Sequence, residues 1–136
     1  MKEITLDAVV ENIDTVTDFV NESLVEYGYP AKARVQIDVA IDELFGNISR
    51  YAYGSQTGKV TVRVEYDSDA RTVTITFIDS GVPFDPLKRD DPDVTLSAAE
   101  RSIGGLGIFV VKKTMDAVEY EYTDGQNVLK IRKVLV

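Results

Sequence analysis

The sequence predicts an α+β fold: a two-layer sandwich in which a mixed, mainly antiparallel sheet is covered by helices on one face. Segments that alternate apolar and polar residues come mostly in adjacent pairs, which is typical of β-hairpins. Two longer segments near the start carry apolar residues at helical spacing instead. The resulting order is strand, two helices, two strands, a long loop, a helix and two strands.

The first strand and the two helices come first. Residues 3–7 alternate in polarity and predict a short strand. Asn12 is a plausible cap for the first helix, which ends near Gly28, since glycine and proline together stop helices. The second helix is expected from about residue 31 to residue 53. The apolar positions are Ile13, Val16, Val20 and Leu24 in the first helix and Ile37, Ile41, Leu44, Ile48 and Ala52 in the second.

The second half supplies two hairpins and a third helix. The first predicted hairpin has strands at 60–65 and 72–77, joined by a turn at 67–70. A helix is expected from about 106 to 115, and the second hairpin has strands at 118–122 and 128–133, joined by a turn at 124–127. Between the hairpins, residues 82–103 are acidic and interrupted by prolines, with a short helical turn expected at 96–101. So long a loop in a compact domain is more often functional than structural.

Composition excludes several classes of function. The chain of 136 residues suits one domain, and it contains neither cysteine nor histidine. Disulfides, thiolate nucleophiles and zinc sites built on cysteine are therefore excluded, and proton transfer must use carboxylates, lysine or tyrosine. A net charge of −8 argues against general binding to nucleic acid. Without a membrane-spanning apolar run or a signal-peptide core, we expect no membrane contact and a cytoplasmic protein.

The second helix has a polar stripe beside its apolar one. Glu43 and Asn47 are four residues apart, so their side chains lie one above the other and can converge on one object. A carboxylate accepts a proton or binds a hard cation, and an amide oxygen is a neutral ligand for the same cation. The alternative is a solvated polar face. Arg50, one turn further on, either reaches a phosphate or is simply solvated.

Two glycine-containing segments are further candidates. Asp79, at the end of a strand, either accepts a hydrogen bond from a ligand's amino group or caps a turn, and Gly81 would let a flat ring approach the backbone. Gly104, Gly105 and Gly107 precede the third helix, whose N-terminus favours anions. A helix-entry turn without a ligand is the alternative. The segment is neither a P-loop nor a dinucleotide fingerprint.

Taken together, the order Glu43-x-x-x-Asn47, Asp79-x-Gly81, long loop and Gly104-Gly105-x-Gly107 resembles the ATPase superfamily of DNA gyrases, histidine kinases and mismatch-repair ATPases. Within it, the chain is most similar to the single-domain anti-sigma factor serine/threonine kinases. The similarity lies in DELFGNISRYAYG, DSGVPFDP, and GGLGIFVVKKTMD followed by YEYTDGQNVLKI, and covers nearly the whole chain. The resemblance implies one histidine-kinase-like ATPase domain over residues 1–136.

The resemblance implies a role for each motif. Asn47 would ligate Mg²⁺ that also touches the nucleotide phosphates, and Glu43 would be the general base. Asp79 would bind the adenine amino group, with Gly81 lining the adenine pocket. Backbone N–H groups for the phosphates would come from Gly104, Gly105, Leu106 and Gly107.

The loop from about 86 to 103 would be an ATP lid, and its Arg101 could approach the γ-phosphate on closure. One position departs from the family, because many relatives have histidine where this chain has Tyr51. A tyrosine can pack and hydrogen-bond there, so nucleotide binding is expected to be intact.

The implied activity is an ATP-dependent serine/threonine kinase that phosphorylates an anti-sigma factor antagonist in a partner-switching pathway, and that also sequesters a sigma factor. A homodimer is expected, with the open sheet face and the N-terminal strand as candidate surfaces. The alternative is a nucleotide-gated protein-binding module with little or no transfer. Glu43 favours the kinase, because a binding module needs no base there, whereas Tyr51 leaves room for the module.

Overall fold

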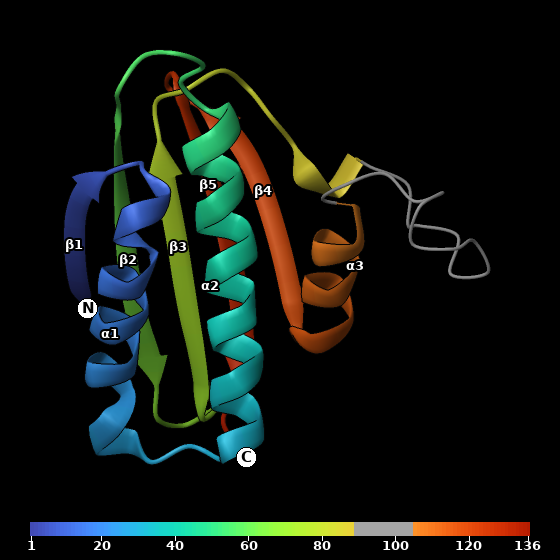
Figure 1. The fold of residues 1–136 in the computed structure, drawn as a ribbon. Helices are drawn as coiled ribbons and strands as arrows, with labels where there is room; N and C mark the ends of the chain where they lie inside the picture. Colours follow the sequence, from blue (N-terminus) through green and yellow to red (C-terminus); the bar gives the residue numbers. More distant parts are fainter. Residues whose placement is uncertain (89–104) are drawn as a thin grey trace.

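The computed structural model describes residues 1–88 and 105–136 (Figure 1). The strands are β1 (Lys2–Asp7), β2 (Lys59–Asp67), β3 (Thr72–Asp79), β4 (Ala117–Thr123) and β5 (Gln126–Val134), and the helices are α1 (Ile13–Leu24), α2 (Ala31–Tyr51) and α3 (Gly105–Thr114). Short 3-10 turns lie at Val10–Asn12, Val25–Tyr27 and Pro86–Lys88. Each predicted strand and helix is present, and most ends lie within one or two residues of the predicted ones. The exception is α1, which ends at Leu24 rather than near Gly28 and is followed by the 3-10 turn at Val25–Tyr27. The helical turn expected at 96–101 lies outside the described residues.

The five strands form one sheet in the order β1-β2-β3-β5-β4. All four pairings are antiparallel, so the α+β sandwich is confirmed and its sheet is not mixed. Two pairings, β2 with β3 and β4 with β5, are hairpins and must be antiparallel. Between β1 and β2 the chain passes through α1 and α2, which run in opposite directions, so β2 returns antiparallel to β1 (Figure 1).

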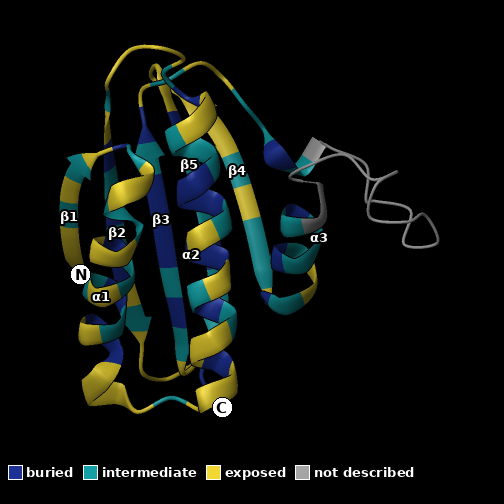
Figure 2. Cartoon of the chain, viewed as in Figure 1, coloured by how far each residue is buried: buried dark blue, intermediate teal, exposed yellow. Residues whose placement is uncertain are grey.

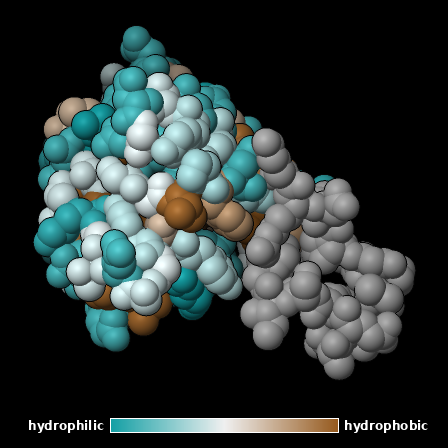
Figure 3. All heavy atoms as spheres, turned by 90° about the horizontal axis from the view of Figure 1, so that it is seen from above, coloured by the Kyte–Doolittle hydropathy of each residue, from teal (hydrophilic) through white to brown (hydrophobic). Residues whose placement is uncertain are grey.

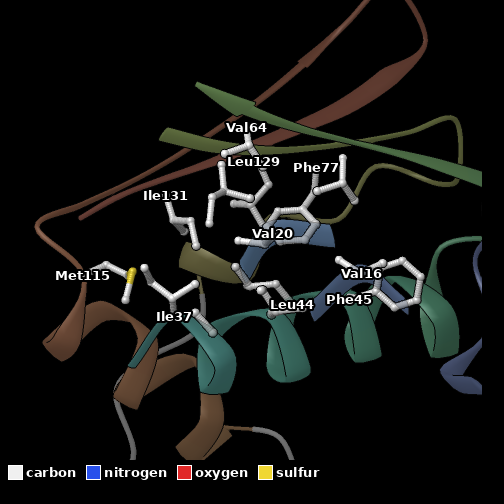
Figure 4. Packing of buried hydrophobic residues seen from close by; sticks show 14 of the residues in the cluster. Val16, Val20, Ile37, Leu44, Phe45, Val64, Phe77, Met115, Leu129 and Ile131 are labelled. Carbon is white, nitrogen blue, oxygen red and sulfur yellow. The ribbon is translucent and has the colours of Figure 1, made fainter. Parts of the chain in front are cut away.

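The hydrophobic core lies between the helices and one face of the sheet (Figure 2). Every second residue of the central strands points into it, as Figure 4 shows for Phe77 and Leu129 opposite Leu44 and Phe45 of α2. The predicted apolar stripe of α2 is confirmed: Ile37 and its neighbours at helical spacing are almost fully buried, and Ile48 packs against the core. This burial fixes how α2 is rotated, and therefore where its polar stripe points.

The two long helices are also joined by a polar contact. The side-chain amide of Asn21 on α1 donates to Asp38 Oδ1 on α2 at 3.1 Å, and Asn21 Oδ1 accepts a hydrogen bond from the Tyr29 hydroxyl. Asn12 precedes α1 as predicted but does not cap it, because its amide donates to the Asp7 carbonyl at 2.9 Å instead. Within the described residues, no helix is long and apolar enough to cross a membrane.

Candidate functional site

The polar stripe of α2 is partly covered by α3. Ala40, about one turn before Glu43 on the same helix face, is fully buried, and Glu43 and Asn47 are half-buried. Helix α3 packs along α2 on this side. The stripe is therefore not a freely solvated face. Only its last member, Arg50, is exposed.

Glu43 meets the beginning of α3. A Cβ added to Gly107 would overlap the Glu43 carboxylate, so this carboxylate lies directly against the backbone of the first turn of α3. The N-terminal turn of a helix carries a partial positive charge and favours negatively charged groups. The structure thus brings together two of the predicted site residues that are far apart in the sequence.

The environment of Glu43 makes it a stronger base than an ordinary glutamate. Burial raises the pKa of its carboxyl group, and the neighbouring charge of Asp42 raises this pKa further, while Arg50 opposes both effects. A general base works best when its pKa lies nearer to the working pH. The direction of the shift therefore suits the role predicted for Glu43.

Arg50 folds back along α2. A Cβ at Gly46 would lie 3.0 Å from Arg50 Nη1, so the guanidinium covers the helix backbone at Gly46 and stays near Glu43. Whether Arg50 contacts a phosphate stays a prediction, because its guanidinium is both close to the predicted base and open to solvent.

A largely apolar pocket opens beside these residues, between the C-terminal half of α2 and the ends of β3, β4 and β5. Its cavity volume is about 30 Å³, and the rest of the hollow is open to solvent. Two predicted site residues, Asn47 and Asp79, line the same pocket. Its apolar wall comes from Leu44, Ile48, Ala52, Val82, Phe84, Pro86 and Leu129. A flat apolar ring with one polar edge is the kind of ligand such a pocket accepts.

The mouth of this pocket carries an aromatic pair. The ring of Tyr51, which is 47% exposed, lies 6.1 Å from the ring of Phe84, centroid to centroid. Tyr51 thus packs at the position where many relatives of the family are expected to have histidine. Val82, which also lines the pocket, is 59% exposed. Seen from above, a small hydrophobic patch lies among mostly hydrophilic residues (Figure 3).

Asp79 is the buried polar group of the pocket, with 4% of its surface exposed. Its Oδ1 accepts two hydrogen bonds, from the backbone N–H of Gly81 at 2.9 Å and from Nδ2 of Asn127 at 2.9 Å. Both of these bonds end on the same oxygen. Among the residues that the structure describes, no hydrogen bond ends on the second oxygen, Oδ2, which can therefore accept one from a ligand.

Gly81 has a packing role that the sequence did not reveal. A Cβ at this position would overlap the backbone carbonyl of Ala52, and the next N–H, of Val82, donates to that same carbonyl at 2.8 Å. The segment after β3 therefore lies directly on the C-terminal end of α2. Gly81 is not among the described residues that line the pocket, so its predicted contact with adenine stays a prediction.

Three polar residues of the site were missed from the sequence. Asn127 and Tyr120 line the pocket, and the Tyr53 hydroxyl donates to the Lys59 carbonyl at 2.5 Å and accepts the Ser80 N–H at 2.8 Å. The sequence carried a signal for one of them. Leu129 and Ile131 point inward on β5, so Asn127, two residues earlier, also points inward, and a polar residue at a core position needs partners.

Part of the predicted site lies outside the described residues. Arg101, Gly104 and residues 89–103 of the predicted lid belong to this part. Gly105 and Leu106 are the first residues of α3, as expected for a helix that begins in the glycine segment.

The residues present fit a metal that arrives with a ligand. Among the described residues, no group of three or more Asp, Glu, His or Cys side chains could hold a metal ion. Mg²⁺ in phosphoryl-transfer sites is commonly held by one or two side chains together with phosphate oxygens and water. Asn47, with Glu43 on the same helix face, is compatible with this arrangement.

Comparisons with known proteins identify the family and the fold. The family described as "Histidine kinase-like ATPase domain" matches residues 6–133. The serine-protein kinase RsbW of Listeria monocytogenes is 29% identical over 112 residues, which are 79% of this chain and 70% of that protein. The serine/threonine-protein kinase BtrW of Bordetella bronchiseptica is 24% identical, over 76% of this chain and 72% of that protein.

Solved structures show the same fold. The RsbU and RsbW domains of Rv1364c from Mycobacterium tuberculosis superpose with a TM-score of 0.65 at 16% identity, and the match covers 99% of this chain but only 33% of that one. The histidine kinase domain of the blue-light activated histidine kinase EL346 from Erythrobacter litoralis gives a TM-score of 0.59 at 14% identity, over 93% of this chain and 60% of that one. Since the family match extends over nearly the whole sequence and the fold agrees, the chain belongs to the histidine kinase-like ATPase domain family.

Proposed function

We propose that this chain is an ATP-dependent serine/threonine protein kinase that acts as an anti-sigma factor and phosphorylates an anti-sigma factor antagonist. One observation carries the proposal. The half-buried Glu43, whose carboxyl pKa is raised by burial, lies against the start of α3. Asn47 lies on the same face of α2 as Glu43, and it lines the apolar pocket together with Asp79. The residues proposed as base and cation ligand thus adjoin the pocket proposed for the purine.

Adenine would lie in the apolar pocket. Asp79 Oδ2 would accept a hydrogen bond from the exocyclic amino group, while Leu44, Ile48 and Leu129 contact the ring faces. A buried carboxylate that accepts a hydrogen bond from a ligand discriminates strongly, because a ligand without the donor leaves the carboxylate unpaired.

The phosphates would lie between the two helices. The backbone N–H groups at the start of α3, at Gly105, Leu106 and Gly107, would bind phosphate oxygens, and Asn47 would hold Mg²⁺. When bound, Mg²⁺ and the triphosphate supply the transferable phosphoryl group and neutralise its charge. The segment at 86–103 would be the lid, and Arg101 within it would add a positive charge.

Glu43 would remove the proton from the substrate hydroxyl. Its carboxylate must be ionised to act as a base, and it must lie near the point where the γ-phosphate ends. Contact with Gly107 places the carboxylate beside the proposed phosphate-binding backbone. Such a position suits proton abstraction from a serine or threonine that approaches from outside the site.

The partners proposed are an antagonist protein as substrate and a sigma factor, bound by a homodimer. The names of the relatives, RsbW and BtrW, support a protein kinase, and the expected dimer surfaces remain the open sheet face and β1. Sedimentation equilibrium of the full chain tests the dimer directly.

Two measurements test the kinase proposal. Calorimetry with ATP, with and without Mg²⁺, should show binding that both Asp79→Asn and Asn47→Ala weaken. Mass spectrometry of a candidate antagonist, incubated with the chain, ATP and Mg²⁺, should show one added phosphoryl group. Glu43→Gln should abolish this addition while it spares ATP binding, and normal phosphorylation by this variant would overturn the base assignment. Binding of ATP without transfer would favour the nucleotide-gated binding module instead.

A further inference from the structure

Among the described residues that line the pocket, Asn127 makes the most side-chain hydrogen bonds. It is the second residue of β5, it is 5% exposed, and it pairs with Asp79 in the β3–β5 register. Its Nδ2 donates to Asp79 Oδ1 and to the Val82 carbonyl, both at 2.9 Å. Its Oδ1 accepts the Phe84 N–H at 3.2 Å and the Tyr120 hydroxyl.

These four contacts fix the orientation of the amide. The partners of Nδ2, a carboxylate and a carbonyl, can only accept hydrogen bonds, and the Phe84 N–H can only donate one. Rotating the amide by 180° would therefore place acceptor against acceptor and donor against donor. Both donor hydrogens are in use, and the side chain has a single arrangement that satisfies every partner.

This arrangement acts on Asp79 in two ways. The bond from Nδ2, together with the Gly81 N–H, occupies Oδ1, so Oδ2 is left for a ligand in the pocket that Asp79 lines. The contacts with Val82 and Phe84 also hold the chain segment that forms one wall of the same pocket. The Asn127 side chain thus fixes both the hydrogen-bond acceptor, Asp79, and the segment at 82–84 that forms one wall of the pocket.

We infer that Asn127 is a positioning residue for adenine binding. Asn127 holds Asp79 so that the pocket selects the exocyclic amino group of the base. The inference deepens the proposed function and depends on it, because it assumes that ATP binds in this pocket. Asn127 acts through Asp79 and the 82–84 segment, not as a group that takes part in phosphoryl transfer.

Two nucleotides test this inference. Purine riboside triphosphate has the ring and phosphates of ATP but lacks the 6-amino group, so the ratio of its Kd to that of ATP reports the amino contact alone. We expect wild type to favour ATP by about 10-fold or more, as for a hydrogen bond to a charged group. Asn127→Ala should bring the ratio close to one, mostly by weakening ATP.

Asn21→Ala is the matched control. Asn21 is also an asparagine with hydrogen bonds to a carboxylate and to a tyrosine hydroxyl, but it joins α1 to α2 and does not line the pocket. Its loss should destabilise the fold by a comparable amount and leave the nucleotide ratio unchanged. A merely structural role of Asn127 would make the two variants behave alike.

Asn127→Asp gives a second, isosteric test if the alanine variant does not fold. The introduced carboxylate would face the Asp79 carboxylate and the Val82 carbonyl. The other titratable groups nearby are Tyr120 and Tyr122 on β4, Tyr51 on α2, and Asp85. Two adjacent carboxylates repel unless they share a proton. ATP binding by this variant should therefore be weak at pH 8 and recover about 10-fold by roughly pH 5.5, relative to wild type at each pH.

The outcomes separate this inference from the proposed function. A wild type that binds neither nucleotide overturns both. If wild type selects ATP and Asn127→Ala keeps the same Kd ratio, this inference is overturned while ATP binding stands. The same holds if ATP binding by Asn127→Asp does not recover in acid. Collapse of the ratio in Asn127→Ala, with no change in Asn21→Ala, supports it.

Discussion

Two carboxylates of the site, Glu43 and Asp79, lie in different surroundings. Asp79 is almost fully buried and accepts hydrogen bonds from a backbone N–H and an amide, which suits a fixed acceptor. Glu43 is half-buried at a helix–helix contact, and its carboxyl pKa is raised mainly by burial. This suits a group that exchanges a proton. The difference is compatible with the proposed roles, recognition for Asp79 and proton transfer for Glu43.

The raised pKa of Glu43 predicts a change of stability with pH. The folded state binds this proton more tightly than the unfolded state, whose glutamate pKa is about 4.3. The stability that Glu43 contributes is therefore fully present below about pH 4.3 and is lost as pH rises through the raised folded value. Glu43→Gln removes this loss. Its free energy of unfolding, measured in urea between about pH 4 and 8, should rise relative to wild type across that window.

Asp42→Asn is the control for this measurement. Asp42 is the exposed neighbour that raises the pKa of Glu43, so its removal should shrink the effect without abolishing it. Identical pH profiles of the free energy of unfolding for wild type and Glu43→Gln would contradict the prediction. Ionising the partly buried Glu43 carboxyl would then have no measurable cost in stability.

Gly107→Ala should separate activity from stability. The new Cβ would meet the end of the flexible Glu43 side chain, which can turn away at a cost of about 1 kcal/mol, and alanine regains about as much in helix propensity. Stability should therefore change little. A displaced base should lower the phosphoryl transfer rate by about 100-fold. The double variant with Glu43→Gln should be no slower than Glu43→Gln alone, and a further loss would show that Gly107 acts through another group.

At the scale of elements, the end of α2 organises the pocket. The Ala52 carbonyl accepts the Val82 N–H, and the Tyr53 hydroxyl bridges the Lys59 carbonyl and the Ser80 N–H. The end of α2 is thereby tied to the start of β2 and to the segment that follows β3. The walls of the pocket thus depend on one helix terminus.

Gly81→Ala should destabilise the protein, in contrast to Gly107→Ala. Here the added Cβ would meet the backbone carbonyl of Ala52 rather than a flexible side chain, so the backbone itself must shift. Overpacking of this kind costs about 1–3 kcal/mol. Urea unfolding should show a loss in this range, together with weaker ATP binding. A change within about 0.5 kcal/mol would mean that the segment after β3 moves away without cost.

Elements were predictable from the sequence because their signals are local. The alternation of Val60, Val62 and Val64, or the helical spacing of Ile37, Ile41 and Leu44, is decided within a few residues and agrees with the observed burial. The pairing partners of the strands are not local. The antiparallel pairing of β1 with β2 follows from the path of the chain through α1 and α2, which no single segment encodes.

The site was predictable only where its residues form motifs. Glu43 and Asn47 were singled out by their spacing and Asp79 by its position at the end of a strand, and the structure places Asn47 and Asp79 in one pocket. Asn127 was assigned to a turn, because its contact with Asp79 depends on the β3–β5 register. The sequence likewise did not show why residue 81 is a glycine, since Ala52, whose carbonyl a Cβ at residue 81 would overlap, lies far away in the sequence.

At the scale of the whole molecule, the pocket joins elements from both halves of the chain. Its lining comes from α2, from the segment after β3, and from β4 and β5. A ligand that binds there contacts groups that separate when the protein unfolds. Ligand binding should therefore stabilise the whole domain and not only the site.

ATP with Mg²⁺ should accordingly raise the thermal stability of the chain by linkage. At a free concentration about 100 times Kd, the gain is about 2.7 kcal/mol, which corresponds to a Tm increase of roughly 5–15 °C for a domain of this size. Asp79→Asn should fold and lose most of this gain, because its amide offers a donor where the amino group of adenine needs an acceptor. Asn21→Ala should melt earlier but keep the full shift, since its contacts join α1 to α2 away from the pocket. An equal shift in wild type and Asp79→Asn would mean that ATP binds without using the buried carboxylate, and the adenine site would have to be sought elsewhere.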